Sequence, residues 1–178
     1  ISYAHSKNFK NIKQIADAKA EIMNNIKKEG TIILNMDDKF YNYLKNKAIK
    51  KNLKVINFSI KNKNSFIKII KIKKDYDKFN LSINVNGLVC TFYSYNKNKS
   101  NLYNILASLA AISLYKNVKD LKKDIFLNIK IPTGRGDVSK ILFKNKKIIL
   151  IDEAFNSNPL SLKTAIENYD KIESKNSK

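Results

Sequence analysis

The sequence predicts an α/β fold in which helices flank a parallel sheet, a small antiparallel sheet lies beside it, and a strand followed by a helix lies near the C-terminus. Two short β-branched runs, residues 31–35 and 54–58, enclose a helical segment. Asn86-Gly87 joins two alternating apolar runs, which is typical of a hairpin. Residues 148–159 pass from an apolar run through a polar turn to a proline, which indicates a strand followed by a helix.

The first predicted helix covers residues 9–28 and carries an apolar stripe at helical spacing. Lys19 falls within the stripe, so we expect it to point inward. A desolvated amine has a depressed pKa, and the neutral group can act as a nucleophile or take up carbon dioxide to form a metal-binding carbamate. Alternatively, its stem packs and its ammonium reaches solvent. His5, the single histidine, is by itself more typical of a surface or capping residue than of a metal ligand.

A βαβ unit is expected from a strand over residues 31–35, a helix over 39–51 and a strand over 54–58. Such a unit implies parallel strands and a right-handed crossover. A polar cluster with Asp37 and Asp38 lies at the carboxyl end of the first strand. One of these two residues is expected to cap the helix, with ligand contact as the alternative.

An antiparallel sheet is expected over residues 66–95, with a strand over 66–73 beside a hairpin. A two-residue Asn-Gly loop fixes the hairpin register through type I′ geometry. Cys90 is then a packed small hydrophobe rather than a nucleophile. The predicted pairs, all on one face, are Val85 with Leu88, Ile83 with Cys90, and Leu81 with Phe92.

Residues 102–115 are apolar nearly all round and predict a buried helix, and residues 118–129 predict a second, amphipathic one. Asn101 and Asn104 stand at the N-terminus of the buried helix, where polar groups contact ligands. Asn101 could equally cap the helix. Arg135, the only arginine, lies between two glycines in a loop, which suggests a task that a lysine ammonium cannot perform.

The C-terminal segment predicts strands over residues 139–143 and 148–152, the second as a buried parallel strand. A helix over 159–172 follows, with Asn158 as N-cap and Pro159 at its first position. The turn between strand and helix is unusually polar, because it contains Asp152, Glu153, Asn156 and Asn158. These residues either only terminate and cap the elements or form a site at the carboxyl edge of a sheet.

The composition limits the classes of function. The net charge is +20, yet 34 of the 35 basic residues are lysines spread along the whole chain, so we expect no specific nucleic-acid site, only nonspecific binding at low salt. A 43% hydrophobic content supports a core. No apolar run is long enough to insert into a membrane, no signal peptide is recognisable, and a single cysteine suits the cytoplasm.

Five stretches form a pattern when taken in order. They are Ala4-His5 with Phe9 and AKAEI (18–22), TIILNMDD (31–38), NLYNILA (101–107), Gly134-Arg135 and IDEAFNSNP (151–159). Together these stretches resemble the ATP-dependent Mur ligases, and the resemblance covers nearly the whole chain. Residues 18–22 and 151–159 are most similar to the members that join D-alanyl-D-alanine to UDP-N-acetylmuramoyl-tripeptide.

The resemblance implies a ligase of peptidoglycan synthesis in which ATP, with Mg2+, phosphorylates the carboxylate of the UDP-muramoyl peptide. The amine of D-alanyl-D-alanine then attacks the acyl phosphate. A monomer is expected. The resemblance implies that His5 is a magnesium ligand and that Lys19 is a carbamylated lysine that supports magnesium. It implies that Asn101 and Asn104 contact the adenine, and that Arg135 and Asp152 contact the phosphate and ribose side of the nucleotide. Asn156 and Asn158 would lie at the hinge to the C-terminal domain.

By the same resemblance, residues 1–146 form part of the central ATP-binding domain and residues 147–178 begin the C-terminal ligase domain. The family's phosphate-binding loop and N-terminal domain would precede residue 1, and the sequence contains no GxxxxGKS or GxxxxGKT. The chain alone is therefore not expected to turn over ATP. The alternatives are a related ligase such as folylpolyglutamate synthase, or a catalytically silent basic remnant with nonspecific nucleic-acid binding.

Overall fold

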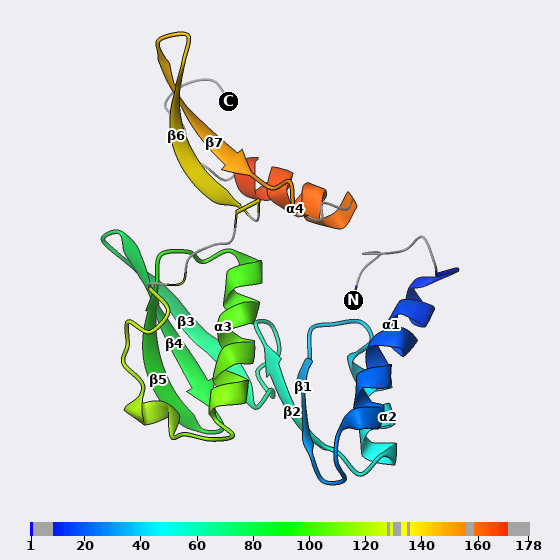
Figure 1. Cartoon of the computed structure of the whole chain (residues 1–178). Helices are drawn as coiled ribbons and strands as arrows, with labels where there is room; N and C mark the ends of the chain where they lie inside the picture. The colour runs from blue at the N-terminus through cyan, green and yellow to red at the C-terminus, as the bar shows by residue number, and fades with distance from the viewer. Residues whose placement is uncertain (2–8, 128, 130–132, 135, 156–158, 171–178) are drawn as a thin grey trace. The chain divides into compact units, whose positions relative to one another are not determined.

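The computed structural model describes residues 1, 9–127, 129, 133, 134, 136–155 and 159–170 (Figure 1). The chain divides into two compact units. Of the described residues, the first unit contains 1 and 9–127, and the second contains 129, 133, 134, 136–155 and 159–170. Among the described residues, no helix has both the length and the apolar character needed to cross a membrane.

The first unit is built on one five-stranded mixed sheet with the order β1-β2-β3-β4-β5. The predicted parallel pair is confirmed, because β1 (Thr31–Asn35) runs parallel to β2 (Lys54–Ser59). The antiparallel strands do not form a separate sheet as expected. β3 (Ile67–Asp75) continues the sheet through two parallel pairs, Phe58 with Ile67 and Ser59 with Lys68.

The predicted hairpin is confirmed in its register. β4 (Lys78–Val85) and β5 (Leu88–Ser94) pair Val85 with Leu88, Ile83 with Cys90 and Leu81 with Phe92. Asn86 and Gly87 both have positive φ angles, 49° and 89°, which is the conformation of a type I′ turn. Cys90 is partly buried and packs against the core, as expected.

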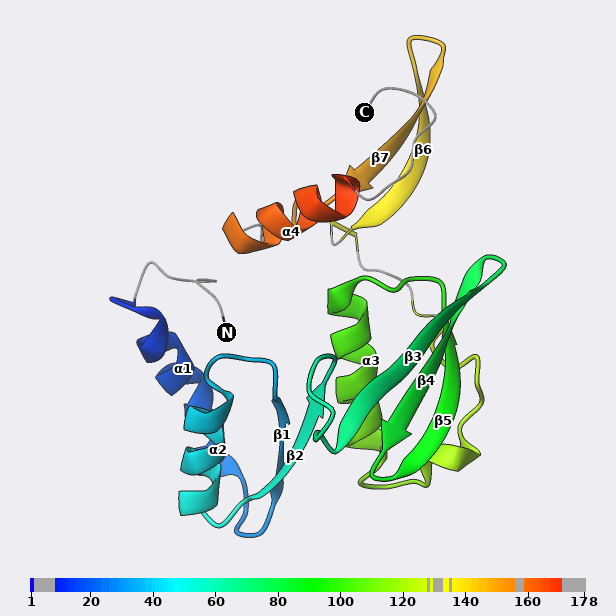
Figure 2. The same ribbon diagram turned by 180° about the vertical axis from the view of Figure 1, so that it is seen from behind.

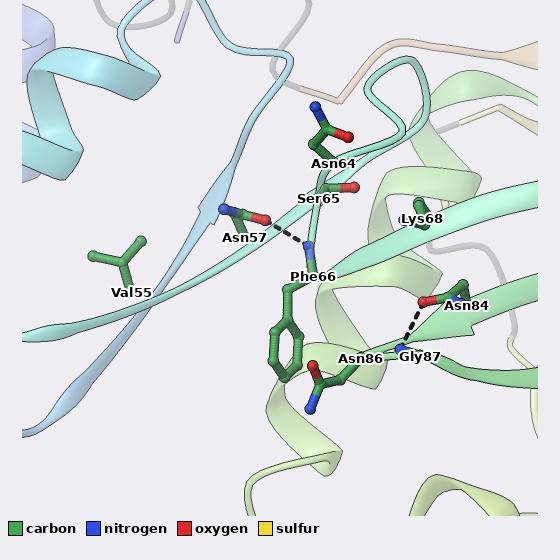
Figure 3. Close-up of a pocket in the computed structure, with 9 residues that line it drawn as sticks. All are labelled: Val55, Asn57, Asn64, Ser65, Phe66, Lys68, Asn84, Asn86 and Gly87. Atoms are coloured by element: carbon green, nitrogen blue, oxygen red, sulfur yellow. Dashed lines mark hydrogen bonds between the residues drawn. The ribbon is translucent and has the colours of Figure 1, made fainter.

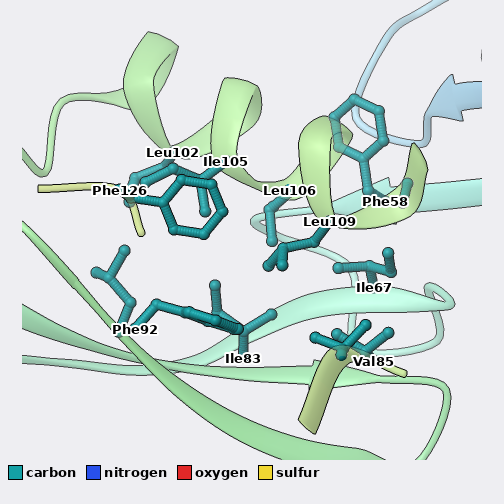
Figure 4. Packing of buried hydrophobic residues seen from close by; sticks show 13 residues of the cluster. Phe58, Ile67, Ile83, Val85, Phe92, Leu102, Ile105, Leu106, Leu109 and Phe126 are labelled. Carbon is teal, nitrogen blue, oxygen red and sulfur yellow. The ribbon is translucent and has the colours of Figure 1, made fainter. Parts of the chain in front are cut away.

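The main core lies between α3 (Lys99–Ile112) and one face of the sheet (Figures 1 and 4). The helix contributes a nearly continuous apolar surface, and the strands contribute every second residue. Figure 4 shows both sets of side chains pointing toward each other. The buried members are Phe58, Ile67, Leu81, Ile83, Val85, Phe92, Leu102, Ile105, Leu106, Leu109, Ala110, Val118 and Phe126.

A smaller core lies on the opposite face of β1 and β2, under α1 (Ile12–Ala20), the 3-10 turn η2 (Glu21–Asn25) and α2 (Tyr41–Lys50). Both views show these helices beside β1 and β2 (Figures 1 and 2). The predicted long first helix is therefore split, because its regular part ends at Ala20. The buried members of this core are Ala20, Met23, Ala48 and Leu53.

The predicted starts of two helices are wrong. α2 begins after Phe40, so neither Asp37 nor Asp38 is its N-cap; the Asp38 carboxylate instead accepts a hydrogen bond from Phe40 N–H at 2.8 Å. α3 begins at Lys99, because Asn98, not Asn101, provides the capping side chain.

Residues 118–129 do not form the predicted second helix. Only the 3-10 turn η3 (Val118–Asp120) is helical there, within the residues described. The reason is that this segment contacts β5, which is distant from it in the sequence. Tyr93 in β5 donates its backbone N–H to the carbonyl of Lys123 at 2.7 Å, and the Phe126 ring packs edge-on against Phe92 at 5.4 Å. These contacts with β5 hold the segment against the edge of the sheet in an irregular, non-helical conformation.

The second unit contains β6 (Asp137–Phe143), β7 (Lys146–Asp152) and α4 (Pro159–Asp170). The expectation of a buried parallel strand over 148–152 is wrong, because β7 pairs antiparallel with β6 and residues 146–150 are exposed. The positive φ angles of Lys144 and Asn145 close this hairpin. The predicted domain boundary at 146/147 would separate the two hairpin strands and stays a prediction. α4 begins at Pro159 as predicted, while Asn158 lies outside the described residues.

Candidate functional site

A hydrogen-bonded network around Asp37 joins the carboxyl ends of β1 and β2. Asn35 Oδ1 accepts a hydrogen bond from the Asp37 backbone N–H at 2.9 Å, which sets the turn after β1. The Asp37 carboxylate accepts from the Ser59 hydroxyl at 2.6 Å and from Ile60 N–H at 2.8 Å. Ser59 is fully buried. The carboxylate is therefore fixed at the edge of the sheet where α/β proteins bind ligands.

Tyr103 connects this network to α3. Its hydroxyl donates to Asp37 Oδ2 at 3.1 Å, and its ring packs edge-on against Phe58 with centroids 6.3 Å apart. Burial alone would raise the pKa of the Asp37 carboxyl, but the hydrogen bonds from Ser59, Ile60 and Tyr103 outweigh it and lower the pKa. Burial, followed by the nearby Asp37 charge, raises the pKa of Tyr103 to about 12. At neutral pH the contact is thus a phenol donating to a carboxylate.

Asn101 and Asn104 lie three residues apart near the start of α3, so their side chains leave the same side of the helix. They differ in environment. Asn101 Nδ2 donates to Ser94 Oγ at 3.0 Å and to the Asn96 carbonyl at 2.7 Å, which ties the helix to the end of β5. Asn104 is exposed. Of the two predicted ligand contacts, Asn104 is the more exposed, and Asn101 is partly buried.

Lys19 is exposed, so the expectation of an inward-pointing amine is wrong. The helical period places Lys19 on the stripe, but α1 makes its close contacts through Ile15, Ala16 and Ala20, which are buried. A long lysine side chain one residue before the end of the helix can extend past such a contact into solvent. The structure therefore matches the alternative in which the ammonium reaches water.

In the second unit, backbone hydrogen bonds join the glycine loop to the turn after β7. Gly136 N–H donates to the Asp152 carbonyl at 2.6 Å, and Phe155 N–H donates to the Gly134 carbonyl at 2.9 Å. Asp152 Oδ1 accepts from Ala154 N–H at 2.9 Å. Both glycines have positive φ angles, and a Cβ on Gly134 would lie 2.9 Å from the Phe155 Cβ. The two motifs that sequence reasoning treated separately are therefore parts of one loop pair.

Sequence reasoning missed an open pocket of about 390 Å³ between β2 and the start of β3 (Figure 3). It forms because β3 begins opposite the end of β2, so the two strands pair at only two positions and the earlier part of β2 has no strand of β3 beside it. Its amides already bond within the wall: Asn57 Oδ1 accepts from Phe66 N–H at 2.7 Å, and Asn84 Oδ1 accepts from Gly87 N–H at 3.0 Å. The lining residues are Val55, Asn57, Asn64, Ser65, Phe66, Lys68, Asn84, Asn86 and Gly87.

A family model described as the Mur ligase middle domain matches residues 1–112, which is more than half of the chain. The chain belongs to the Mur ligase family. It is 32% identical over 178 residues to the UDP-N-acetylmuramoyl-tripeptide–D-alanyl-D-alanine ligase of Buchnera aphidicola, with 94% of this chain and 36% of that protein covered. It is 26% identical over 161 residues to the UDP-N-acetylmuramate–L-alanine ligase of Borrelia garinii, with 86% and 33% covered. The chain thus spans about a third of the length of these relatives.

Solved structures of Mur ligases share the fold. MurF from Acinetobacter baumannii superposes with a TM-score of 0.79 at 21% identity, covering 97% of this chain and 36% of that protein. MurF from Thermotoga maritima in complex with ADP gives 0.72 at 20% identity, covering 94% and 36%. These similarities confirm the predicted α/β fold class, in which helices flank a sheet; the small antiparallel sheet of this chain is β6-β7 and not residues 66–95.

Within this Mur ligase chain, four of the predicted site residues lie outside the described residues: His5, Arg135, Asn156 and Asn158. Asn101 and Asn104 lie together in the first unit, and Asp152 lies in the second. Among the described residues, no three His, Cys, Asp or Glu side chains gather as a metal site.

Two members of the Asp37 network, Ser59 and Tyr103, were not found from the sequence. The available signals were a serine at the carboxyl end of a strand and a tyrosine in an otherwise apolar helix. Neither signal indicates a partner, because Tyr103 is 66 residues from Asp37 along the chain.

Proposed function

We propose that the protein containing this chain is an ATP-dependent ligase of peptidoglycan precursor synthesis that joins D-alanyl-D-alanine to UDP-N-acetylmuramoyl-tripeptide through an acyl phosphate. The observation that carries the proposal is the similarity to the Buchnera aphidicola ligase of that name across 94% of the chain. The IDEAFNSNP turn and the AKAEI block at residues 18–22 favour the same member of the family.

ATP is the proposed nucleotide. Asn104, exposed at the start of α3, would contact the adenine, and Asn101 would approach it from the same side of the helix. Asp152 and Arg135 would hold the ribose and phosphate side. The backbone bonds between the loop and turn that contain them support this pairing. Asn156 and Asn158 would stand at the hinge to the C-terminal ligase domain.

Mg2+ is the proposed metal, with His5 as a ligand and a carbamylated Lys19 in support. Carbamylation requires a neutral amine, so the exposed Lys19 would have to be desolvated by groups beyond the described residues. Mg2+ usually binds one or two carboxylates together with waters and substrate phosphates, so the proposal does not require a cluster of three protein ligands. When bound, magnesium neutralises charge on the transferring phosphoryl group.

A second candidate is addition of L-alanine to UDP-N-acetylmuramate, because a relative with that name aligns over 86% of the chain. The two reactions share ATP and the acyl-phosphate chemistry and differ in the acceptor amine. Glutamate addition to a folate and loss of activity are the remaining alternatives. We further propose a cytoplasmic monomer that does not insert into membranes and that binds nucleic acid only nonspecifically, through its lysines.

The test is ATP-dependent phosphate release by the full gene product that contains this chain. UDP-N-acetylmuramoyl-tripeptide with D-alanyl-D-alanine is compared with UDP-N-acetylmuramate with L-alanine, and each substrate is also omitted in turn. Release that needs both members of the first pair supports the proposal. Release with the second pair only moves the assignment to L-alanine addition. A folded protein that turns over neither pair nor a folate with glutamate overturns the ligase assignment.

Lys19→Ala in the same assay tests the role of Lys19, with and without added bicarbonate. We expect loss of turnover in this variant, since alanine cannot form a carbamate. Lys28→Ala, at another exposed lysine, is the matched control and should retain the wild-type rate. Equal rates in the two variants would remove Lys19 from the site.

A further inference from the structure

Two sets of side-chain hydrogen bonds hold the N-terminal turns of α3 to the ends of strands. On one side, Asn101 Nδ2 bonds to Ser94 and Asn96 at the end of β5. On the other side, the Tyr103 hydroxyl donates to Asp37 after β1. The exposed Asn104 follows Tyr103 directly. The direction in which Asn104 leaves the helix is therefore set by contacts that its own side chain does not make.

Asp37 is well suited to hold Tyr103 in place, because it is itself held. Its Oδ1 accepts from the fully buried Ser59 hydroxyl and its Oδ2 from Ile60 N–H, so both oxygens are fixed to the end of β2. Hydrogen bonds to a charged acceptor are shorter and stronger than neutral ones. The Tyr103 ring is held separately by its edge-on contact with Phe58. The hydroxyl contact of Tyr103 can therefore be removed while its ring contact is kept.

We propose that Asp37 is a positioning residue for nucleotide binding, which acts through the Tyr103 hydroxyl to fix the end of α3 that presents Asn104. The inference rests on the proposed function, because it takes ATP as the ligand of Asn104. Asp37 does not touch the nucleotide. It keeps Asn104 in the orientation that binds it, so that less ordering is needed on binding.

Tyr103→Phe tests this step, because it removes only the hydroxyl and keeps the ring against Phe58. ADP affinity is measured by calorimetry on the full gene product, at a temperature well below unfolding. We expect the Kd for ADP to rise about fivefold, with kcat at saturating ATP nearly unchanged. Asp37→Asn keeps the size of the side chain and removes its charge, and it should raise Kd in the same way.

Ser113→Ala is the matched control on the same helix. The Ser113 hydroxyl donates to the Ala110 carbonyl at 2.9 Å, at the opposite end of α3. Its loss should lower the melting temperature as a structural contact does and leave ADP affinity at the wild-type value. A rise in Kd as large as that of Tyr103→Phe would show that α3 stability, not its N-terminal end, controls binding.

A double-mutant cycle with Asn104→Ala separates positioning from general damage. If Asp37 acts through Asn104, adding Tyr103→Phe to Asn104→Ala should change Kd by less than about twofold. The inference would be overturned if Tyr103→Phe left the Kd for ADP unchanged, or if its full fivefold effect persisted in the absence of the Asn104 side chain. In either case, ADP binding by the wild type would leave the proposed function standing. Absence of ADP binding and of turnover in the wild type would overturn both.

Discussion

Gly134→Ala should disrupt the loop that meets the turn after β7. Gly134 has a φ of +76°, and an added Cβ would lie 2.9 Å from the Phe155 Cβ and 3.0 Å from its backbone nitrogen. A left-handed conformation costs a residue with a Cβ about 1–2 kcal/mol. The contact is with backbone and Cβ atoms, which cannot rotate away, and such overpacking adds about 1–3 kcal/mol. We therefore expect the second unit to lose about 2–5 kcal/mol of stability.

Gly87→Ala isolates the conformational part of this effect. Gly87 has a φ of +89°, but a Cβ there would meet nothing within 4 Å. It should cost only about 1–2 kcal/mol, measured as urea-induced unfolding by circular dichroism. Amide hydrogen exchange at Phe155 reports the site directly, because this N–H donates to the Gly134 carbonyl. Its protection should fall in Gly134→Ala and not in Gly87→Ala. Equal losses of stability and unchanged protection at Phe155 would refute the steric argument.

Three further predictions concern the first unit. Leu106→Ala, at a fully buried position in α3, should reduce the free energy of unfolding by about 2–5 kcal/mol in urea titrations, whereas Leu114→Ala at an exposed position should cost far less. Because the pKa of Asp37 is lowered in the fold, its contribution to stability is present above the ordinary carboxyl pKa of 3.8 and is lost as the pH falls through the lower folded value; Asp37→Asn should flatten this part of the acid-unfolding curve. Because the pKa of Tyr103 is raised from 10.0 to about 12, stability should decline as the pH rises between these values, and the ultraviolet tyrosinate titration of Tyr103→Phe should lack one late-ionising group.

Local sequence signals predicted the elements whose geometry depends on neighbouring residues. Asn86-Gly87 determined the hairpin register, because both residues accept positive φ angles and a two-residue loop leaves no freedom in pairing. The start of α4 followed from Pro159, whose fixed φ suits the first turn of a helix. The βαβ unit followed from its spacing.

Two failures come from contacts between distant segments. Residues 118–129 have a helical pattern, but the edge of β5 binds their backbone through Tyr93 and Lys123. The Asp37 network was missed for the same reason, since Tyr103 reaches it from a helix that periodicity marks only as buried. The error in β7 has a local cause: its apolar run predicts a buried parallel strand, but a tight turn at Lys144 and Asn145 pairs it with the adjacent strand β6.

Asn101 and Asn104 show how the structure separates two residues that the motif treats alike. The Asn101 amide donates two hydrogen bonds that hold α3 to the end of β5, and Asn104 is exposed. Removing the partly buried Asn101 amide deletes two hydrogen bonds, each worth about 0.5–1.5 kcal/mol, although Ser94 Oγ and the Asn96 carbonyl stay bonded to each other. Truncating the exposed Asn104 side chain costs little stability. Asn101→Ala should therefore lower both the melting temperature and ADP affinity, and Asn104→Ala should lower ADP affinity alone. If both asparagines only contacted the adenine, the two variants should show the same losses. Thermal unfolding and calorimetry on the two variants therefore discriminate between two models. In one, the asparagines are equivalent ligands, and in the other, Asn101 orients the helix for Asn104.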